Sequence, residues 1–123
     1  MADASPARAA SVLEAVSNAL VRLHKEQFGR GPVSARATLN DDTLVCVLHD
    51  ALLPAERALT EMGHGLRVQE SRLFFQAATR DKFIATVETI VGRQVVAFSS
   101  ALDPNAAVVW EIFGLQPHDL RTK

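Results

Sequence analysis

The sequence predicts a single α+β domain with the element order α-β-β-α-α-β-β. Two hairpins would form one mostly antiparallel four-stranded sheet, with helices packed on one face. Apolar residues recur at helical spacing before residue 28 and alternate from residue 34, so the hydrophobic period changes there. A second helical stretch then precedes another pair of apolar segments. With 123 residues, 48% hydrophobic and 22% charged, the chain has the size and composition of one globular domain.

The first helix is expected over residues 6–28. Ser5 can cap its free N–H groups, and Pro6 suits the first helical position. The apolar residues of one face follow at helical spacing: Val12, Leu13, Val16, Leu20, Leu23 and Phe28. Gly29 should end the helix, and Pro32 prevents it from resuming.

A β-hairpin and a short helix are expected next. Residues 34–39 alternate between the two faces of a strand, residues 40–42 have turn chemistry, and residues 43–49 are almost all apolar. Pro54 then suits the first position of a short helix that should run to about Met62 and stop at Gly63.

A long helix should run over residues 66–91 and stop at Gly92. It carries one apolar stripe, widened by three further side chains: Leu73, Ala77, Ile84, Val87 and Val91, with Phe75, Phe83 and Ile90. We therefore expect this helix to be buried along one broad face.

The second hairpin follows, with strands over residues 93–102 and 107–115 and a turn over residues 103–105. The ordered core should span about residues 6–115, leaving a polar tail over 116–123.

Two strands are apolar on both faces, namely residues 43–49 and 107–115. An antiparallel sheet with helices on one side should show polar residues on the other. The apolar surplus, which includes the lone Trp110 as a core or interface anchor, predicts that another subunit covers the second face of the sheet or its strand edge, and that the chain is a homodimer.

Charge and composition disfavour several classes of protein. Thirteen Lys and Arg balance fourteen Asp and Glu, which gives no basic surface for nucleic acid. Neither a signal peptide nor a membrane span is expected, so we predict a cytoplasmic protein without direct membrane insertion. The single cysteine, Cys46, lies in an apolar strand and should be a small buried hydrophobe.

The glycine-rich segment after the first helix is the most site-like stretch of the chain. Gly29, Gly31 and Pro32 follow a helix C-terminus, the negative end of its dipole, so the segment is a structural joint and a poor phosphate cradle. Arg30 and Arg36 remain candidate binding residues, since they could converge on a carboxylate, phosphate or bicarbonate.

Glu56 falls in the first turn of the short helix, where a carboxylate can meet free N–H groups. We expect that capping role first and a place in a polar contact surface second. Arg72 and Arg80, with Asp81, should form a solvated or ion-paired flank of the long helix.

No metal, cofactor or catalytic residue is predicted. The histidines and the cysteine have no spacing typical of a compact ligand set: His24, His49, His64, His118 and Cys46. Cys46 and His49, three apart on a strand, should point to opposite faces. We expect unconnected histidines, with His118 in the tail.

Several blocks of the chain resemble the small bacterial MpsC-type domain: Phe28-Gly29-Arg30-Gly31-Pro32, Arg36, the turn at 40–42, residues 52–56 and residues 92–98. The resemblance covers about residues 10–115, although Leu53 stands where a Thr is common in that family. It implies an association with a Na⁺-translocating, membrane-potential-generating system whose other parts resemble inorganic-carbon uptake machinery. It implies no catalytic residues.

We therefore expect a non-enzymatic, cytoplasmic accessory or regulatory module that acts by protein–protein contact, with a membrane-transport protein as a partner. Arg30, Arg36 and Glu56 are its candidate contact residues. One alternative is a small-anion or small-ligand sensor that uses Arg30 and Arg36. Another is a small enzyme with its site at a dimer interface.

Overall fold

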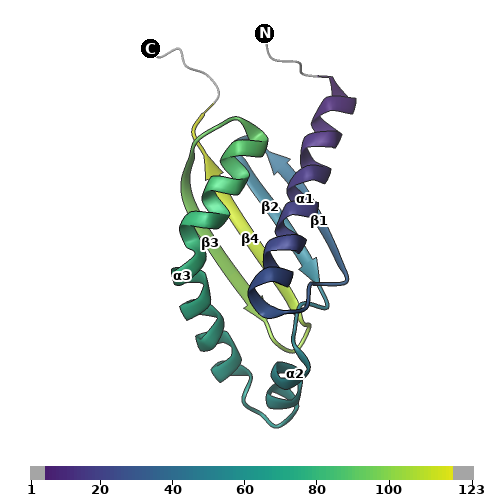
Figure 1. Ribbon diagram of the computed structural model, residues 1–123, viewed down its shortest axis with the longest axis vertical. Helices are drawn as coiled ribbons and strands as arrows, with labels where there is room; N and C mark the ends of the chain where they lie inside the picture. The colour runs from purple at the N-terminus through teal and green to yellow at the C-terminus, as the bar shows by residue number, and fades with distance from the viewer. Residues whose placement is uncertain (1–4, 118–123) are drawn as a thin grey trace.

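The computed structural model describes residues 5–117, so the predicted tail from residue 118, with His118, lies outside the described residues. The predicted α-β-β-α-α-β-β order is confirmed (Figure 1). The elements are α1 (Pro6–Phe28), β1 (Ser34–Asn40), β2 (Thr43–His49), α2 (Pro54–Glu61), α3 (Gly65–Val91), β3 (Val95–Asp103) and β4 (Val108–Leu115).

The ends of α1 confirm the start and stop signals in the sequence. The hydroxyl of Ser5 accepts a hydrogen bond from the N–H of Arg8 at 3.2 Å. Gly29 takes a left-handed conformation with φ 81° and donates its N–H to the carbonyl of Lys25. Gly92 ends α3 in the same way with φ 71°. Glycine adopts this conformation without the clash that a Cβ would cause.

The four strands form one antiparallel sheet in the order β1-β2-β4-β3. Each hairpin pairs its own two strands, and the pairing of β2 with β4 joins the hairpins. The third strand begins at Val95, not at residue 93 as predicted. Arg93 instead lies in the bend that follows α3, where its Nη2 donates to the carboxylate of Asp42 at 2.5 Å and to the carbonyl of Gln116 at 2.7 Å.

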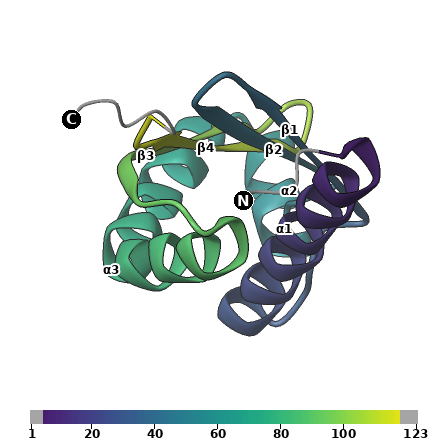
Figure 2. The same ribbon diagram turned by 90° about the horizontal axis from the view of Figure 1, so that it is seen from above.

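Both long helices lie on the same side of the sheet (Figure 2). α1 packs on β1 and β2, and α3 packs on β3. The side chains that fill the space between helices and sheet include the fully buried Val16, Leu20, Leu44, Leu48, Val87 and Phe113. Burying one such side chain contributes about 1.5–3 kcal/mol, so this layer supplies most of the driving force for folding.

The other side of the sheet carries no element among residues 5–117 (Figure 2). Val45 pairs with Ile112 and Val47 pairs with Trp110 in the register of β2 and β4. We call these four half-buried side chains the open face. The sequence-based prediction that the central strands are apolar on both sides is confirmed.

The prediction for the first half of α3 is wrong. Leu73 is 57% exposed, and Phe75 is also exposed, although both were expected on the buried stripe. The buried line instead runs through Val68, Arg72, Phe83 and Val87. Because α3 carries apolar residues on several faces, spacing alone could not distinguish the buried line from the predicted stripe beside it. The buried line also includes a charged residue, Arg72.

Candidate functional site

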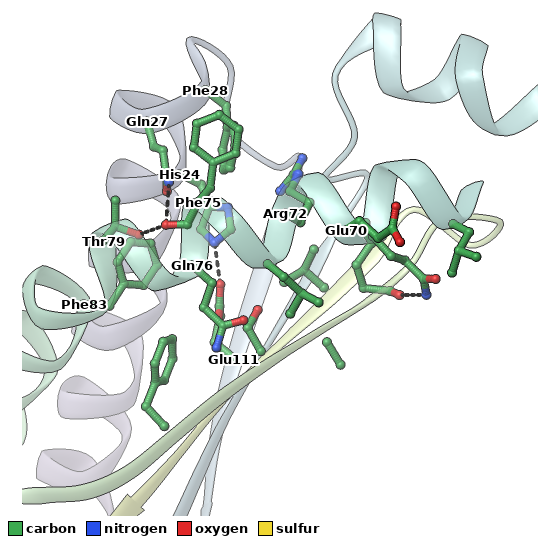
Figure 3. Close-up of a pocket in the computed structure, with 18 residues that line it drawn as sticks. His24, Gln27, Phe28, Glu70, Arg72, Phe75, Gln76, Thr79, Phe83 and Glu111 are labelled. Atoms are coloured by element: carbon green, nitrogen blue, oxygen red, sulfur yellow. Dashed lines mark hydrogen bonds and ion pairs between the residues drawn. The ribbon is translucent and has the colours of Figure 1, made fainter. Parts of the chain in front are cut away.

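A pocket of about 310 Å³ lies between α1 and α3, above β3 and β4 (Figure 3). α1 contributes His24, Gln27 and Phe28 to its lining, and β4 contributes Val109 and Glu111. The first half of α3 and the middle of β3 complete the wall. The pocket therefore depends on the helices lying side by side on one face of the sheet.

Aromatic side chains line much of this pocket. Phe28 and Phe75 meet edge to face with ring centroids 5.1 Å apart, which joins α1 to α3. Phe83 meets the ring of His24 edge to face at 5.6 Å and packs near Phe98 at 6.2 Å. Edge-to-face and offset arrangements are the favoured geometries of aromatic pairs, so these walls are well packed.

A buried histidine–carboxylate pair lies among these walls. Nε2 of His24 is 2.7 Å from Oε2 of Glu111, and their side chains are only 5% and 4% exposed. Glu111 occupies an inward position of β4 between the buried Val109 and Phe113. Side chains alternate between the faces of a strand, so this position directs the carboxylate toward the helices.

The second oxygen of this carboxylate, Oε1 of Glu111, is buried without a hydrogen-bond partner within residues 5–117. A buried acceptor that makes no hydrogen bond costs free energy, more when the group is charged. Such groups are uncommon in folded proteins. This oxygen is thus an unpaired, buried acceptor on a residue that lines an otherwise mostly apolar pocket.

Arg72 also lines the pocket, and it is tied in place by Glu56. Its Nε and Nη2 donate to the two carboxylate oxygens of Glu56 at 2.7 and 2.6 Å, and Nη2 also donates to the carbonyl of Ala51. The guanidinium lies 4.0 Å from the centroid of Phe28. Arg72 was predicted to lie on a solvated or ion-paired flank with Arg80 and Asp81; it is ion-paired, but with Glu56, and it is buried.

Glu56 has the capping role that the sequence predicts. Its Oε1 accepts the N–H of Leu53 at 2.8 Å, at the start of α2. Burial alone would raise the pKa of Glu56, but hydrogen bonds from Arg72 and from Leu53 outweigh burial and hold it below its usual range. The carboxylate of Glu56 is therefore kept in its charged form, and both of its oxygens already accept hydrogen bonds.

The two candidate arginines lie in different places. Arg30 donates to the carbonyl of Leu52 at 2.7 Å and pairs with Asp50 at 3.3 Å, which also pairs with Arg57. Arg36 is exposed on β1, opposite Val47 and on the same side of the sheet as the open face. The structure thus does not bring Arg30 and Arg36 together on one ligand.

The glycine–proline segment, which the sequence analysis interprets as a structural joint, packs against the end of α1. A Cβ on Gly31 would meet the backbone oxygen of Val21 and the Cβ of Lys25 at 3.3 Å, so the chain passes close to α1 there. Pro32 is buried beside it. Gly29 supplies the turn that ends α1.

Cys46 is buried, as predicted. Burial, and to a smaller extent the charge of Glu111, raises the pKa of its thiol to about 12. His24 contacts Glu111, a pairing that the sequence analysis did not predict, whereas His49 and His64 are exposed. No three metal-ligating side chains gather within the described part of the chain.

Two residues of this site were missed by sequence reasoning. Glu111 could have been noticed in the sequence. It is a charged residue on the same face of an alternating strand as the apolar Phe113 and Leu115. Arg72 left a weaker one, at four residues from Val68 on the helix line that proves to be buried. The pairing of Glu111 with His24 joins positions 87 residues apart, which no local pattern encodes.

A family model described as "Na+-translocating membrane potential-generating system (MpsC)" matches residues 9–116. No curated protein and no solved structure matches the chain. Across residues 5–117, each helix is too short or too polar to cross a membrane.

Proposed function

The chain belongs to the MpsC family, and on that basis we propose that it is a non-enzymatic accessory component of a Na⁺-translocating, membrane-potential-generating system. It acts on the cytoplasmic side by binding a membrane-embedded protein of that system. The family match covers almost the whole domain, so the proposal concerns this domain itself.

The observation that carries the protein-contact role is an apolar surface on the first half of α3. Leu66, Leu73 and Phe74 are 69%, 57% and 79% exposed. They lie at spacings of seven and eight residues along one helix, so they share a side of it. We call these three residues the α3 strip. Exposed apolar side chains that gather in this way are typical of interaction surfaces.

The chemistry around the α3 strip favours a protein partner over a lipid surface. Glu70 lies between the apolar residues on the same side of the helix and is exposed. The exposed Arg67 lies seven residues before Phe74, so the charges beside the strip have mixed sign and form no basic cluster that would attract anionic lipid headgroups, whereas apolar anchors with polar neighbours are normal in protein interfaces. A groove or helix face on the partner would accommodate Phe74 as the most exposed anchor.

The test is affinity capture from detergent-solubilised membranes of the native cells. The tagged chain should capture an integral membrane subunit of a cation-translocating system. The double variant Leu73→Ser/Phe74→Ser should lose that subunit, while Val96→Ser, which alters an exposed apolar residue of β3, should retain it. The proposal would be contradicted if both variants captured the subunit equally well, or if the unaltered chain captured no integral membrane subunit.

We further propose that the open face is the interface of a homodimer. Val45, Val47, Trp110 and Ile112 form a continuous apolar patch because they are paired neighbours in the sheet. Arg36 lies on the β1 edge of this side and Asp103 on the β3 edge. A two-fold axis along the strands would place each edge over the opposite edge of the other copy, with opposite charges near one another.

Light scattering at micromolar concentration tests the dimer. We expect twice the mass of one chain, and the single-chain mass for Trp110→Asp, which puts a charge in the centre of the patch. A single-chain mass for the unaltered protein would contradict the interface. The apolar centre of this face gives no support to an enzyme with its site at a dimer interface.

A further inference from the structure

We propose that the pocket between α1 and α3 binds a small organic amine, with its apolar or aromatic body between the helices and its protonated amino group donating to Oε1 of Glu111. Independent features of the pocket support this ligand class: its size, its walls and the state of the charged groups around it. The inference does not depend on the proposed role at the membrane.

The size of the pocket suits a ligand of one aromatic ring with a short tail. Its volume is about 310 Å³. An engineered apolar cavity of about 150 Å³ is large enough to take up benzene, so this pocket offers about twice that space. It lies at the lower end of the usual range for small-molecule sites.

The walls suit an apolar or aromatic body. Phe75 and Phe83 contribute rings from α3, and Leu102 and Val109 contribute aliphatic surface from β3 and β4. One face of Phe28 is already covered by the guanidinium of Arg72. Further aromatic rings remain to contact the ligand body, and aromatic faces also attract an ammonium group.

The charged groups favour a cationic head over an anionic one. His24 engages only Oε2 of Glu111, which leaves Oε1 without a partner inside residues 5–117. Among the described residues, the lining contains one arginine, Arg72, and its bidentate pair with Glu56 neutralises it. An incoming carboxylate or phosphate would therefore face an acidic group with no unpaired arginine, whereas an ammonium group would complete the hydrogen bonding of Glu111.

Three matched probes test this inference on the full-length protein by calorimetry and ligand-observed NMR: 2-phenylethylamine, 2-phenylethanol and 3-phenylpropionate. They share the ring and differ in the head group. We expect the amine to bind at least about tenfold more tightly than the carboxylate, with the affinity of the alcohol between them. A hydrogen bond to a charged group contributes more free energy than a neutral one, and the difference corresponds to about that factor in affinity. Equal affinities, or no amine binding at millimolar concentration, would overturn the proposal. The absence of amine binding is also the result expected if a tightly held water molecule donates a hydrogen bond to Oε1 and is not displaced by the amine.

A pair of variants identifies the carboxylate responsible. Glu111→Gln keeps the shape of the side chain and should weaken amine binding about tenfold while changing alcohol binding less than about threefold. Glu70→Gln removes a charge from the exposed rim of the same pocket and should leave amine binding within about twofold. The assignment would be contradicted if Glu111→Gln still bound the amine more tightly than the other two probes by the same factor. It would also be contradicted if Glu70→Gln lost that preference for the amine. If circular dichroism shows that Glu111→Gln does not fold, the three probes on the unaltered protein decide the question.

Discussion

Nε2 of His24 lies 2.7 Å from Oε2 of Glu111, and this contact joins α1 to β4 across 87 residues of sequence. Both side chains are almost completely buried. Buried ionisable pairs pay for their desolvation and are often no more stabilising than apolar residues of the same size. The pair with its unpaired oxygen is therefore weak evidence for stability, which agrees with the binding role proposed for it above.

Breaking the pair on one side should be costly. His24→Leu leaves the carboxylate of Glu111 buried without its partner, and we expect a loss of about 3–5 kcal/mol in the free energy of unfolding. The double variant His24→Leu/Glu111→Leu removes both polar groups and should recover most of that loss. Urea denaturation of the three proteins measures the difference. A double variant that is less stable than His24→Leu would show that the pair itself stabilises the fold.

Stability should depend on the ionisation of Glu56. The pKa of this group in the folded chain lies below its usual 4.5 because the hydrogen bonds from Arg72 and Leu53 outweigh the effect of burial. A lowered folded pKa means that the contribution is present above pH 4.5 and is lost as the pH falls through the folded value. Glu56→Gln should therefore be less stable than the unaltered protein at pH 6, and the gap should narrow toward pH 3.

The control for this titration is Glu61→Gln, which alters an exposed glutamate on the same helix. Its stability should stay within about 0.5 kcal/mol of the unaltered protein at every pH. Urea denaturation at several pH values follows both variants. A constant gap for Glu56→Gln from pH 6 to pH 3 would mean that the carboxylate of Glu56 does not carry the effect.

The thiol of Cys46 should be inert in the folded protein. Burial, followed by the charge of Glu111, raises its pKa to about 12, so almost no thiolate is present at pH 8. A thiol-specific disulfide reagent should react slowly with the native chain and completely in urea. Rapid reaction of the native protein would contradict the placement of Cys46 in the core.

Gly29 should be needed for its backbone conformation alone. Its φ is 81°, and no atom lies within 4 Å of the position that a Cβ would take. Gly29→Ala should therefore cost about 1 kcal/mol through the left-handed conformation, and Gly29→Asn should cost less because asparagine tolerates it better. Thermal unfolding compares the two variants. Equal stability of Gly29→Ala and the unaltered chain would contradict a conformational role.

The order and type of the elements could be predicted from sequence because local signals specify them. Ser5, Pro6 and Gly29 mark the ends of α1, and the alternation in residues 34–49 marks the first hairpin. The strand order β1-β2-β4-β3 could not be predicted, since strand pairing depends on contacts between distant segments. The buried face of α3 was missed because its apolar residues lie on several sides of the helix.

The candidate site was mostly hidden from sequence reasoning. Glu56 was predicted as a cap, but its pairing with Arg72 depends on how α2 packs against α3. Glu111 could be recognised as a site residue only from the structure, in which α1 places His24 beside it on β4. The exposure of Phe74 became visible only once the true core line of α3 was known.

Contact between the α3 strip and a membrane-embedded protein is the central claim, and site-specific photo-cross-linking tests it most directly. A benzophenone side chain replaces Phe74 in cells that contain the intact membrane system, and Glu14 on the exposed side of α1 is replaced as the control. We predict a covalent adduct with an integral membrane subunit of the cation-translocating system from position 74 and none from position 14. No adduct from position 74, or the same adduct from both positions, would contradict the account.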